Sequence, residues 1–227
     1  MSAKRRLALY GGTFDPVHLG HVEVARAVSK LFEIEEVLFI PAQVAPHKVG
    51  RPVTAPLHRY AMLALATQDD PQLAVSTFEI EAPDRRYTAD TLAHFIQLWG
   101  ETSNLFFIMG ADSWSEITTW RDWRQVLTMV NHIVVTRPGY ELSGLQEMAQ
   151  RIVDLRIDKS LNVPSVGNDT SIYLTDIVMR DVSATQIRSL AFAGRFRDLT
   201  QFVPVSVANY IEKYAIYQES NEAQFNS

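Results

Sequence analysis

Residues 11–21, GGTFDPVHLGH, combine residue types that suit the binding of an anion. The stretch begins with Gly11 and Gly12, and residues without a Cβ allow a ligand to approach the main chain closely. It ends with His18 and His21, whose imidazole N–H groups can donate to phosphate oxygens from one side of a helix entry. The composition therefore predicts a phosphate-binding turn.

The residues around this turn predict how the chain enters and leaves it. The apolar run Leu7–Tyr10 comes directly before it and is typical of a buried strand. Asp15 and Pro16 favour a turn that delivers the chain to a helix starting near Leu19. A helix start presents free N–H groups and partial positive charge, so an anion is the expected guest.

The same residues allow two other interpretations. His18 and His21 could be metal ligands, but they supply only two, the chain has no cysteine, and no acidic residue stands at an obvious third-ligand offset. We therefore expect no metal site built by the protein. The dinucleotide fingerprint G-x-G-x-x-G would place its third glycine where this chain has Pro16, so the stretch differs from it.

A second candidate phosphate site lies late in the chain, at residues 183–188 (SATQIR). Ser183 or Thr185 can cap the helix that follows, and Arg188, one turn on, can supply a forked cationic donor. Taken alone, the stretch is better explained as a capped surface helix with an exposed arginine.

Composition limits the class of protein. Of 227 residues, 47% are hydrophobic and 21% are charged, which is typical of a soluble globular chain, and no stretch approaches the ~20 apolar residues of a membrane helix. The net charge of −5 argues against a general nucleic-acid binder. The absence of cysteine excludes a disulfide framework and a thiolate nucleophile, and it is compatible with the cytoplasm, where we expect the protein to act.

Short apolar runs alternate with amphipathic segments along the chain. The predicted strands are 7–10, 37–40, 73–76, 105–109, 133–136 and 172–174, and the predicted helices include 22–32, 56–66, 89–99 and 205–214. This alternation predicts an α/β fold, a doubly wound, Rossmann-like parallel sheet with helices on both faces. We expect one domain over residues 1–217, followed by a flexible tail over residues 218–227.

The first stretch resembles a known signature. Eight of its positions match the G-G-x-F-D-P-x-H-x-G-H motif of the nucleotidyltransferases, and residues 183–188 match that family's later S-x-T-x-x-R element. The resemblance implies that both motifs bind ATP, with His18, His21 and Arg188 as catalytic residues. The implied ATP-binding set is Gly11, Gly12, Thr13, Phe14, His18, Gly20, His21, Ser183, Thr185 and Arg188.

Three middle stretches narrow the resemblance. Residues 46–48 (PHK), residues 87–92 (YTADTL), and residues 109–113 (MGADS) with Thr119, Trp120 and residues 137–139 (RPG) are similar to bacterial nicotinate-nucleotide adenylyltransferases. The similarity runs from about Leu7 to Tyr217. It implies that nicotinate mononucleotide is held by His47, Lys48, Tyr87, Thr88, Gly110, Asp112, Trp120 and Arg121.

The residues themselves agree with these roles. Trp120 offers a flat apolar face for a pyridine ring, and Thr88, as a helix cap, would present a hydroxyl and free N–H groups. Asp112 follows the fourth predicted strand, which should lie next to the first and face the same crevice. The chain departs from the family pattern at Ala45, often proline, and at Arg121, often tyrosine. The family implies that a main-chain N–H at Trp120 or Arg121 binds the nicotinate carboxylate.

The resemblance implies transfer of the adenylyl group of ATP to nicotinate mononucleotide, with Mg²⁺ bound to the triphosphate. Three alternatives stay open at this point: transfer to another phosphate acceptor, nucleotide sensing without turnover, and a fragment of a class I aminoacyl-tRNA synthetase. The last is disfavoured by the acidic balance. The sequence leaves the oligomeric state open, a homo-oligomer included.

Overall fold

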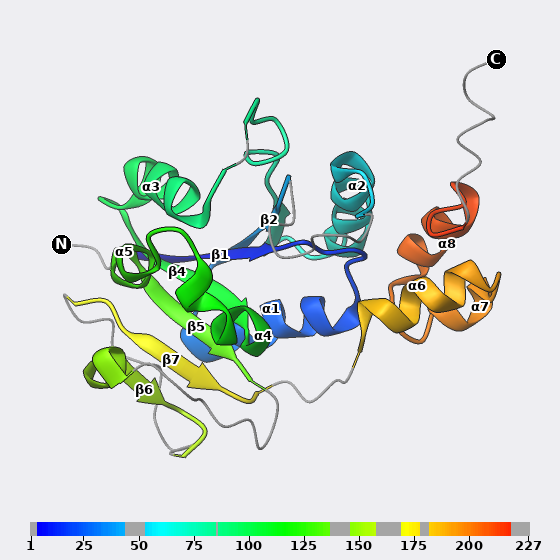
Figure 1. The fold of residues 1–227 in the computed structure, drawn as a ribbon. Coiled ribbons are helices and arrows are strands. Elements are labelled where there is room, and N and C mark those ends of the chain that lie inside the picture. The colour runs from blue at the N-terminus through cyan, green and yellow to red at the C-terminus, as the bar shows by residue number, and fades with distance from the viewer. Residues whose placement is uncertain are drawn as a thin grey trace.

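The computed structural model describes residues 4–43, 53–84, 86–136, 146–157, 169–177 and 182–218. Within these residues seven strands form one sheet, in the order β3-β2-β1-β4-β5-β7-β6, and every neighbouring pair is parallel (Figure 1). The strands are β1 (Arg5–Gly12), β2 (Glu36–Pro41), β3 (Leu73–Val75), β4 (Ser103–Gly110), β5 (Asn131–Val135), β6 (Ile152–Asp154) and β7 (Ile172–Thr175).

Helices connect these strands and cover the sheet. They are α1 (Leu19–Phe32), α2 (Pro56–Thr67), α3 (Thr88–Trp99), α4 (Ala111–Ser115), α5 (Trp123–Met129), α6 (Ala184–Phe192), α7 (Phe196–Leu199) and α8 (Val205–Lys213), with 3-10 turns η1 (Ile117–Thr119) and η2 (Gln146–Arg151). In the part of the chain that the structure describes, no helix is long and apolar enough to cross a membrane.

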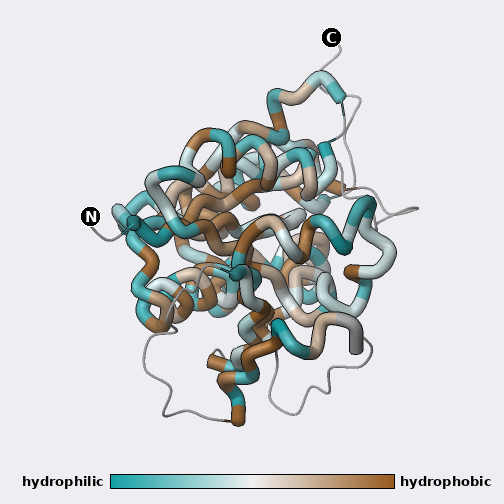
Figure 2. Tube along the Cα trace, turned by 90° about the vertical axis from the view of Figure 1, so that its left-hand side faces the viewer, coloured by the Kyte–Doolittle hydropathy of each residue, from teal (hydrophilic) through white to brown (hydrophobic). Residues whose placement is uncertain are grey.

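The two faces of the sheet bury two separate hydrophobic cores. Successive side chains of a strand point to opposite faces, and in β1 Ala8 and Tyr10 belong to one core while Leu7 and Leu9 belong to the other. Helices α1, α2, α6 and α8 contribute to the first core, and α3 and α5 contribute to the second. Figure 2 shows the apolar segments running through the interior of the trace. The predicted doubly wound α/β fold is confirmed.

The strand order reverses beside β1. The chain moves from β1 to β2 and β3 on one side, and then returns to place β4 against the other side of β1. In such sheets ligands bind beyond the carboxyl ends of the strands at this reversal. The prediction that the first and fourth strands are neighbours is therefore confirmed. The ligand crevice is expected at the carboxyl ends of these two strands.

Candidate active site

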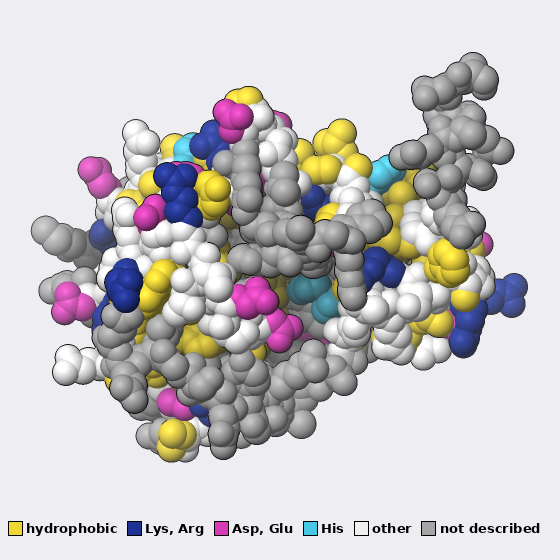
Figure 3. All heavy atoms as spheres, viewed as in Figure 1, with side chains coloured by type: hydrophobic (Ala, Val, Ile, Leu, Met, Phe, Trp, Pro, Cys, Tyr) yellow, Lys and Arg dark blue, Asp and Glu magenta, His cyan; other side chains and the backbone are white. Residues whose placement is uncertain are grey.

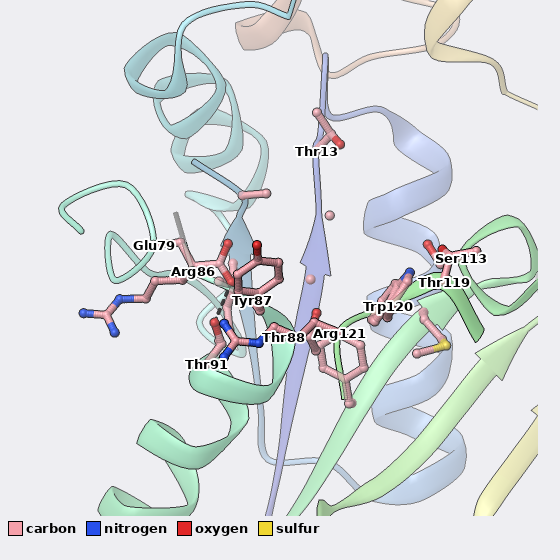
Figure 4. Close-up of a pocket in the computed structure, with 16 residues that line it drawn as sticks. Thr13, Glu79, Arg86, Tyr87, Thr88, Thr91, Ser113, Thr119, Trp120 and Arg121 are labelled. Carbon is pink, nitrogen blue, oxygen red and sulfur yellow. Dashed lines mark hydrogen bonds between the residues drawn. The ribbon is translucent and has the colours of Figure 1, made fainter. Parts of the chain in front are cut away.

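A pocket opens where β1 and β4 end, at the reversal of strand order. Its lining comes from the end of β1, the strands β2 and β4, the start of α3, the loop before α3, and the residues around η1. The lining residues are Gly11, Gly12, Thr13, Ile40, Ala42, Glu79, Arg86, Tyr87, Thr88, Thr91, Phe107, Met109, Ser113, Thr119, Trp120 and Arg121 (Figure 4). Seven of these residues belong to the sets predicted from the sequence.

The two glycines at the end of β1 leave room for aromatic rings. A Cβ on Gly11 would lie 2.9 Å from the Phe107 ring, and a Cβ on Gly12 would lie 2.9 Å from the Phe14 ring. Phe14 itself adopts a positive φ of 49° and packs its edge against the ring of His21, with 5.0 Å between the ring centroids. From the sequence, glycine at these positions was explained by the close approach of a ligand to the main chain. The structure gives a second reason, because neighbouring aromatic rings leave no room for a Cβ.

The two histidines lie together at the start of α1. The helix begins at Leu19 as predicted, with His18 as its N-cap, and the two imidazole rings stack with centroids 3.6 Å apart. The main-chain N–H of His18 donates to Nδ1 of His21 over 3.2 Å. Because Nδ1 is the acceptor, a neutral His21 carries its proton on Nε2.

His18 has an unusual electrostatic environment. Its Nδ1 is buried and has no hydrogen-bond partner among the residues that the structure describes. Burial lowers the pKa of the His18 imidazole to about 4, so the ring is neutral near pH 7. A buried polar atom without a partner is costly, and an anionic ligand that both hydrogen-bonds His18 and favours its charged form would remove that cost.

Arg188 reaches the first motif from α6, at the other end of the chain. Its Nη1 donates to the main-chain oxygen of Asp15 over 2.7 Å, and its Nη2 donates to Oγ1 of Thr185 over 3.0 Å. Ser183 holds the N-cap position of α6, but its side chain makes no capping hydrogen bond. The two stretches that the sequence separated by more than 160 residues therefore meet.

Helix α3 begins one residue earlier than predicted. Thr88 is its first residue and not its cap, and the N-cap position belongs to Tyr87. The main-chain N–H of Tyr87 donates to Oδ2 of Asp90 over 3.1 Å, so the side-chain bond at this helix start comes from Asp90 and not from Thr88. Tyr87 and Thr88 both line the pocket.

Trp120 and Arg121 form the wall opposite α3. The Trp120 side chain is partly buried, and its ring lies edge-on to Phe107 with 6.4 Å between centroids. The guanidinium of Arg121 reaches across to the Tyr87 ring, 4.8 Å from its centroid, so it bridges the two walls. Figure 4 shows Tyr87 and Trp120 on either side of the end of β1.

Sequence reasoning missed the acid in the pocket. Glu79 precedes α3, and its Oε1 accepts a hydrogen bond from Oγ1 of Thr91 over 2.7 Å (Figure 4). Burial raises the pKa of the Glu79 carboxyl, against the opposing effects of the Thr91 bond and the charges of Arg86 and Arg59. No recurring spacing marks Glu79 in the sequence, because it stands on an irregular segment whose path only the fold defines.

Four of the predicted acceptor residues are not in the described pocket. Gly110 is the N-cap of α4 and Asp112 lies exposed in its first turn, and neither lines the pocket. His47 and Lys48 lie outside the described residues, as do residues 137–139.

On the face shown in Figure 3, histidine side chains lie in a hollow near the middle. Among the described residues no three His, Asp or Glu side chains form a metal-binding group.

Comparison with known proteins places this geometry in a family. A family model described as Cytidylyltransferase-like matches residues 9–190. A probable nicotinate-nucleotide adenylyltransferase of Thermoanaerobacter sp. (strain X514) is 39% identical over 222 residues, covering 98% of this chain and 99% of that protein. A protein of the same description from Desulfitobacterium hafniense (strain Y51) is 38% identical, covering 94% of this chain and 96% of its own length.

Solved structures share the fold. The Plasmodium falciparum nicotinic acid mononucleotide adenylyltransferase complexed with NaAD superimposes with a TM-score of 0.70, at 18% identity, over 94% of this chain and 97% of that one. The same enzyme complexed with APC gives a TM-score of 0.68 over the same shares. These likenesses support the α/β Rossmann-like architecture.

Proposed function

The chain belongs to the cytidylyltransferase-like family and, within it, to the nicotinate-nucleotide adenylyltransferases, and we propose that it transfers the adenylyl group of ATP to nicotinate mononucleotide. The products are nicotinate adenine dinucleotide and pyrophosphate, and the reaction is a step of NAD biosynthesis. The observation that carries the proposal is that one segment of the chain joins the pocket to the histidines. Gly12 and Thr13 line the pocket that Trp120 closes, and the same segment continues to the stacked His18 and His21.

In the proposed reaction a phosphate oxygen of nicotinate mononucleotide attacks the α-phosphorus of ATP. A new P–O bond forms, the bond from the α-phosphorus to the bridging oxygen breaks, and pyrophosphate leaves with that electron pair. The attacking phosphate is already anionic, so no general base and no covalent enzyme intermediate are needed. The protein then acts by aligning the two phosphates and by stabilising the charge of the transition state.

The triphosphate is assigned to the first motif and to α6. His18 and His21 bind the α- and β-phosphates, the main-chain N–H groups near Gly12 and Thr13 bind the triphosphate, and Arg188 with Thr185 binds the distal phosphates. Phe14, Gly20 and Ser183 shape the same site. The contact between Arg188 and Asp15 supports this assignment, because it holds the guanidinium against the loop that ends in the histidines.

The acceptor is assigned to the pocket between α3 and the Trp120 wall. The pyridine ring stacks on Trp120, and the start of α3 at Tyr87 and Thr88 supplies N–H groups to an anion. The nicotinate carboxylate lies near the main chain and side chain of Arg121. His47 and Lys48, which follow β2 in the sequence, remain proposed phosphate contacts. Gly110 and Asp112 remain proposed contacts at the end of β4.

A divalent cation accompanies ATP in nucleotidyltransferases generally, and here we propose Mg²⁺. The described residues offer no cluster of carboxylates, so the triphosphate and water would supply most of its ligands. When bound, the cation neutralises part of the charge on the phosphates. We further propose that residues 1–217 act as one domain and that the protein works in the cytoplasm.

One assay separates this proposal from its alternatives. Purified protein is incubated with Mg-ATP and, in parallel, nicotinate mononucleotide, its amide analogue, or phosphopantetheine, while pyrophosphate and the adenylylated product are measured together. CTP replaces ATP in a second series, because the family model includes cytidylyltransferases. We expect equal amounts of pyrophosphate and dinucleotide with ATP and nicotinate mononucleotide. Binding without pyrophosphate release would indicate a sensor, and preference for another acceptor would refute the proposed substrate.

A further inference from the structure

The C-terminal end of the described chain returns to the loop after β1. Helix α8 packs against α2 and α7, and the turn over residues 214–217 follows it (Figure 1). The hydroxyl of Tyr217 donates to Oδ1 of Asp15 over 2.7 Å, although the two residues are 202 positions apart in sequence. Tyr217 belongs to neither of the two motifs, so the motifs do not predict this contact.

Tyr217 is held in a defined position. It has a positive φ of 71°, which a residue with a side chain adopts only when its surroundings require it. Its ring packs against the core formed on the α1 and α8 face of the sheet. Burial and the negative charge of Asp15 raise the pKa of the Tyr217 hydroxyl far above its usual value, so the hydroxyl keeps its proton and acts as a donor.

Asp15 connects this hydroxyl to the ATP motifs. Its side chain is buried, and its second oxygen, Oδ2, accepts a hydrogen bond from the main-chain N–H of Thr54 over 3.3 Å. The main-chain oxygen of the same residue accepts the 2.7 Å bond from Nη1 of Arg188. A shift of Asp15 would therefore displace the partner that orients the guanidinium.

Arg59 fixes the main-chain segments around this arrangement. It is fully buried in α2, and its guanidinium donates to the main-chain oxygens of Thr13 (2.7 Å), Ala42 (2.6 Å) and Thr54 (2.8 Å). Its positive charge also faces Asp15 and Tyr217. Arg59 thus fixes the main chain near Asp15. The Asp15 carboxylate itself is held by the hydroxyl of Tyr217, which comes from the C-terminal turn.

We propose that Tyr217 is a positioning residue for ATP, acting through Asp15 on Arg188. This inference rests on the proposed function in one respect, the assignment of Arg188 to the triphosphate. The Tyr217 hydroxyl does not line the pocket assigned to the acceptor. Its removal should therefore weaken the binding of the triphosphate and leave the binding of nicotinate mononucleotide unchanged.

The test is Tyr217→Phe, which deletes the hydroxyl and keeps the ring. Calorimetry measures the binding of α,β-methylene ATP with Mg²⁺ and, separately, of nicotinate mononucleotide. We expect binding of the ATP analogue to weaken about fivefold to tenfold, as for loss of a hydrogen bond to a charged partner, and acceptor binding to stay within about twofold. Tyr214→Phe is the matched control, because Tyr214 stands in the same turn with an exposed side chain.

A double-mutant cycle with Arg188→Ala tests the route. If Tyr217 acts through Arg188, Tyr217→Phe has little further effect on analogue binding in the Arg188→Ala background. Fully additive effects, equal weakening of both ligands, unchanged binding of the analogue, or failure of Tyr217→Phe to fold would each overturn the positioning role. Because binding is measured directly, the result stands apart from the turnover assay, whose failure would refute the proposed function instead.

Discussion

His21 uses its two ring nitrogens differently. Nδ1 accepts the main-chain N–H of His18 and so serves the start of α1, while Nε2 carries the proton that the proposed mechanism donates to a phosphate oxygen. One side chain thus makes a structural contact and, in the proposed mechanism, a catalytic one. Substitutions that separate them are needed to assign each effect.

His21→Ala removes both contacts and His21→Asn removes mainly the catalytic one, since Oδ1 of asparagine can accept the N–H that Nδ1 accepted. We expect both variants to lower turnover roughly 10²- to 10⁴-fold, because the lost donor acts most strongly in the transition state. Denaturant unfolding should show a loss of about 1 kcal/mol for His21→Ala and less for His21→Asn. Near-normal turnover in either variant would remove His21 from the mechanism.

Arg121 lines the pocket, and its guanidinium lies over the ring of Tyr87 on the facing wall. A guanidinium favours a carboxylate over a neutral amide. We predict that Arg121→Gln lowers kcat/KM about tenfold for nicotinate mononucleotide and changes that for its amide analogue by less than about twofold.

Arg124→Gln is the control for that prediction. The Arg124 guanidinium also lies over an aromatic ring, 4.3 Å from the centroid of Trp123, but Arg124 does not line the pocket. The acid-to-amide ratio of kcat/KM should therefore stay at the wild-type value. If Arg121→Gln preserves the ratio as well, selection for the acid rests on main-chain groups alone.

At the scale of elements, the two glycine positions at strand ends are not equivalent. A methyl group on Gly12 would lie 2.9 Å from the Phe14 ring, whereas nothing lies within 4 Å of one on Gly110. We expect Gly12→Ala to lower the free energy of unfolding by about 1 to 3 kcal/mol through overpacking, and Gly110→Ala to change it by less than about 0.5 kcal/mol. Urea unfolding of the two variants measures the difference, and equal effects would contradict this account of β1.

The elements that the sequence predicted are those with a strong local signal. Apolar runs such as Leu7–Tyr10 predicted six of the strands, because parallel strands buried on both faces are continuously apolar. The position of the fourth strand beside the first was inferred from the doubly wound topology. The three-residue strand β6 was missed, since Ile152–Asp154 carries too short a pattern to distinguish from a loop. The cap of α3 was displaced by one residue because Asp90, not Thr88, supplies the capping oxygen.

The residues of the candidate site also fall into two groups, those that the sequence could predict and those that it could not. Motifs with fixed spacing predicted His18, His21 and Arg188, and α6 holds the last of these against Asp15. Glu79 and Tyr217 could not be found in this way. Glu79 depends on the irregular path of the segment before α3, and Tyr217 depends on a contact with Asp15, 202 positions away in sequence. Neither leaves a periodic pattern in the sequence.

At the scale of the whole molecule, a buried histidine links stability to pH. His132 is fully buried in β5, and its Nδ1 lies 3.0 Å from the main-chain oxygen of Val130. Within the described parts of the chain, its Nε2 has no hydrogen-bond partner. Burial lowers the pKa of this imidazole to about 4, and the charge of Arg151 acts in the same direction. The folded protein therefore resists a proton that the unfolded chain binds near pH 6.5.

The free energy of unfolding should consequently fall as the pH falls from about 6.5 to about 4, by about 3 kcal/mol from His132. His18, whose pKa is also lowered to about 4, contributes in the same direction. Urea unfolding at a series of pH values measures the slope. His132→Asn cannot titrate, so its slope over this window should be shallower than that of the wild type, whatever its stability at pH 7. An unchanged slope would contradict the assignment.

The account depends on one crevice that holds the phosphates and the pyridine ring of a single dinucleotide. A crystal structure of the protein with nicotinate adenine dinucleotide tests this most directly. We predict that the bridging phosphates lie against His18, His21 and the turn at Gly12, with the nicotinate ring on Trp120. A dinucleotide whose phosphates lie away from both histidines, or whose pyridine ring lies outside the pocket between Tyr87 and Trp120, would contradict it.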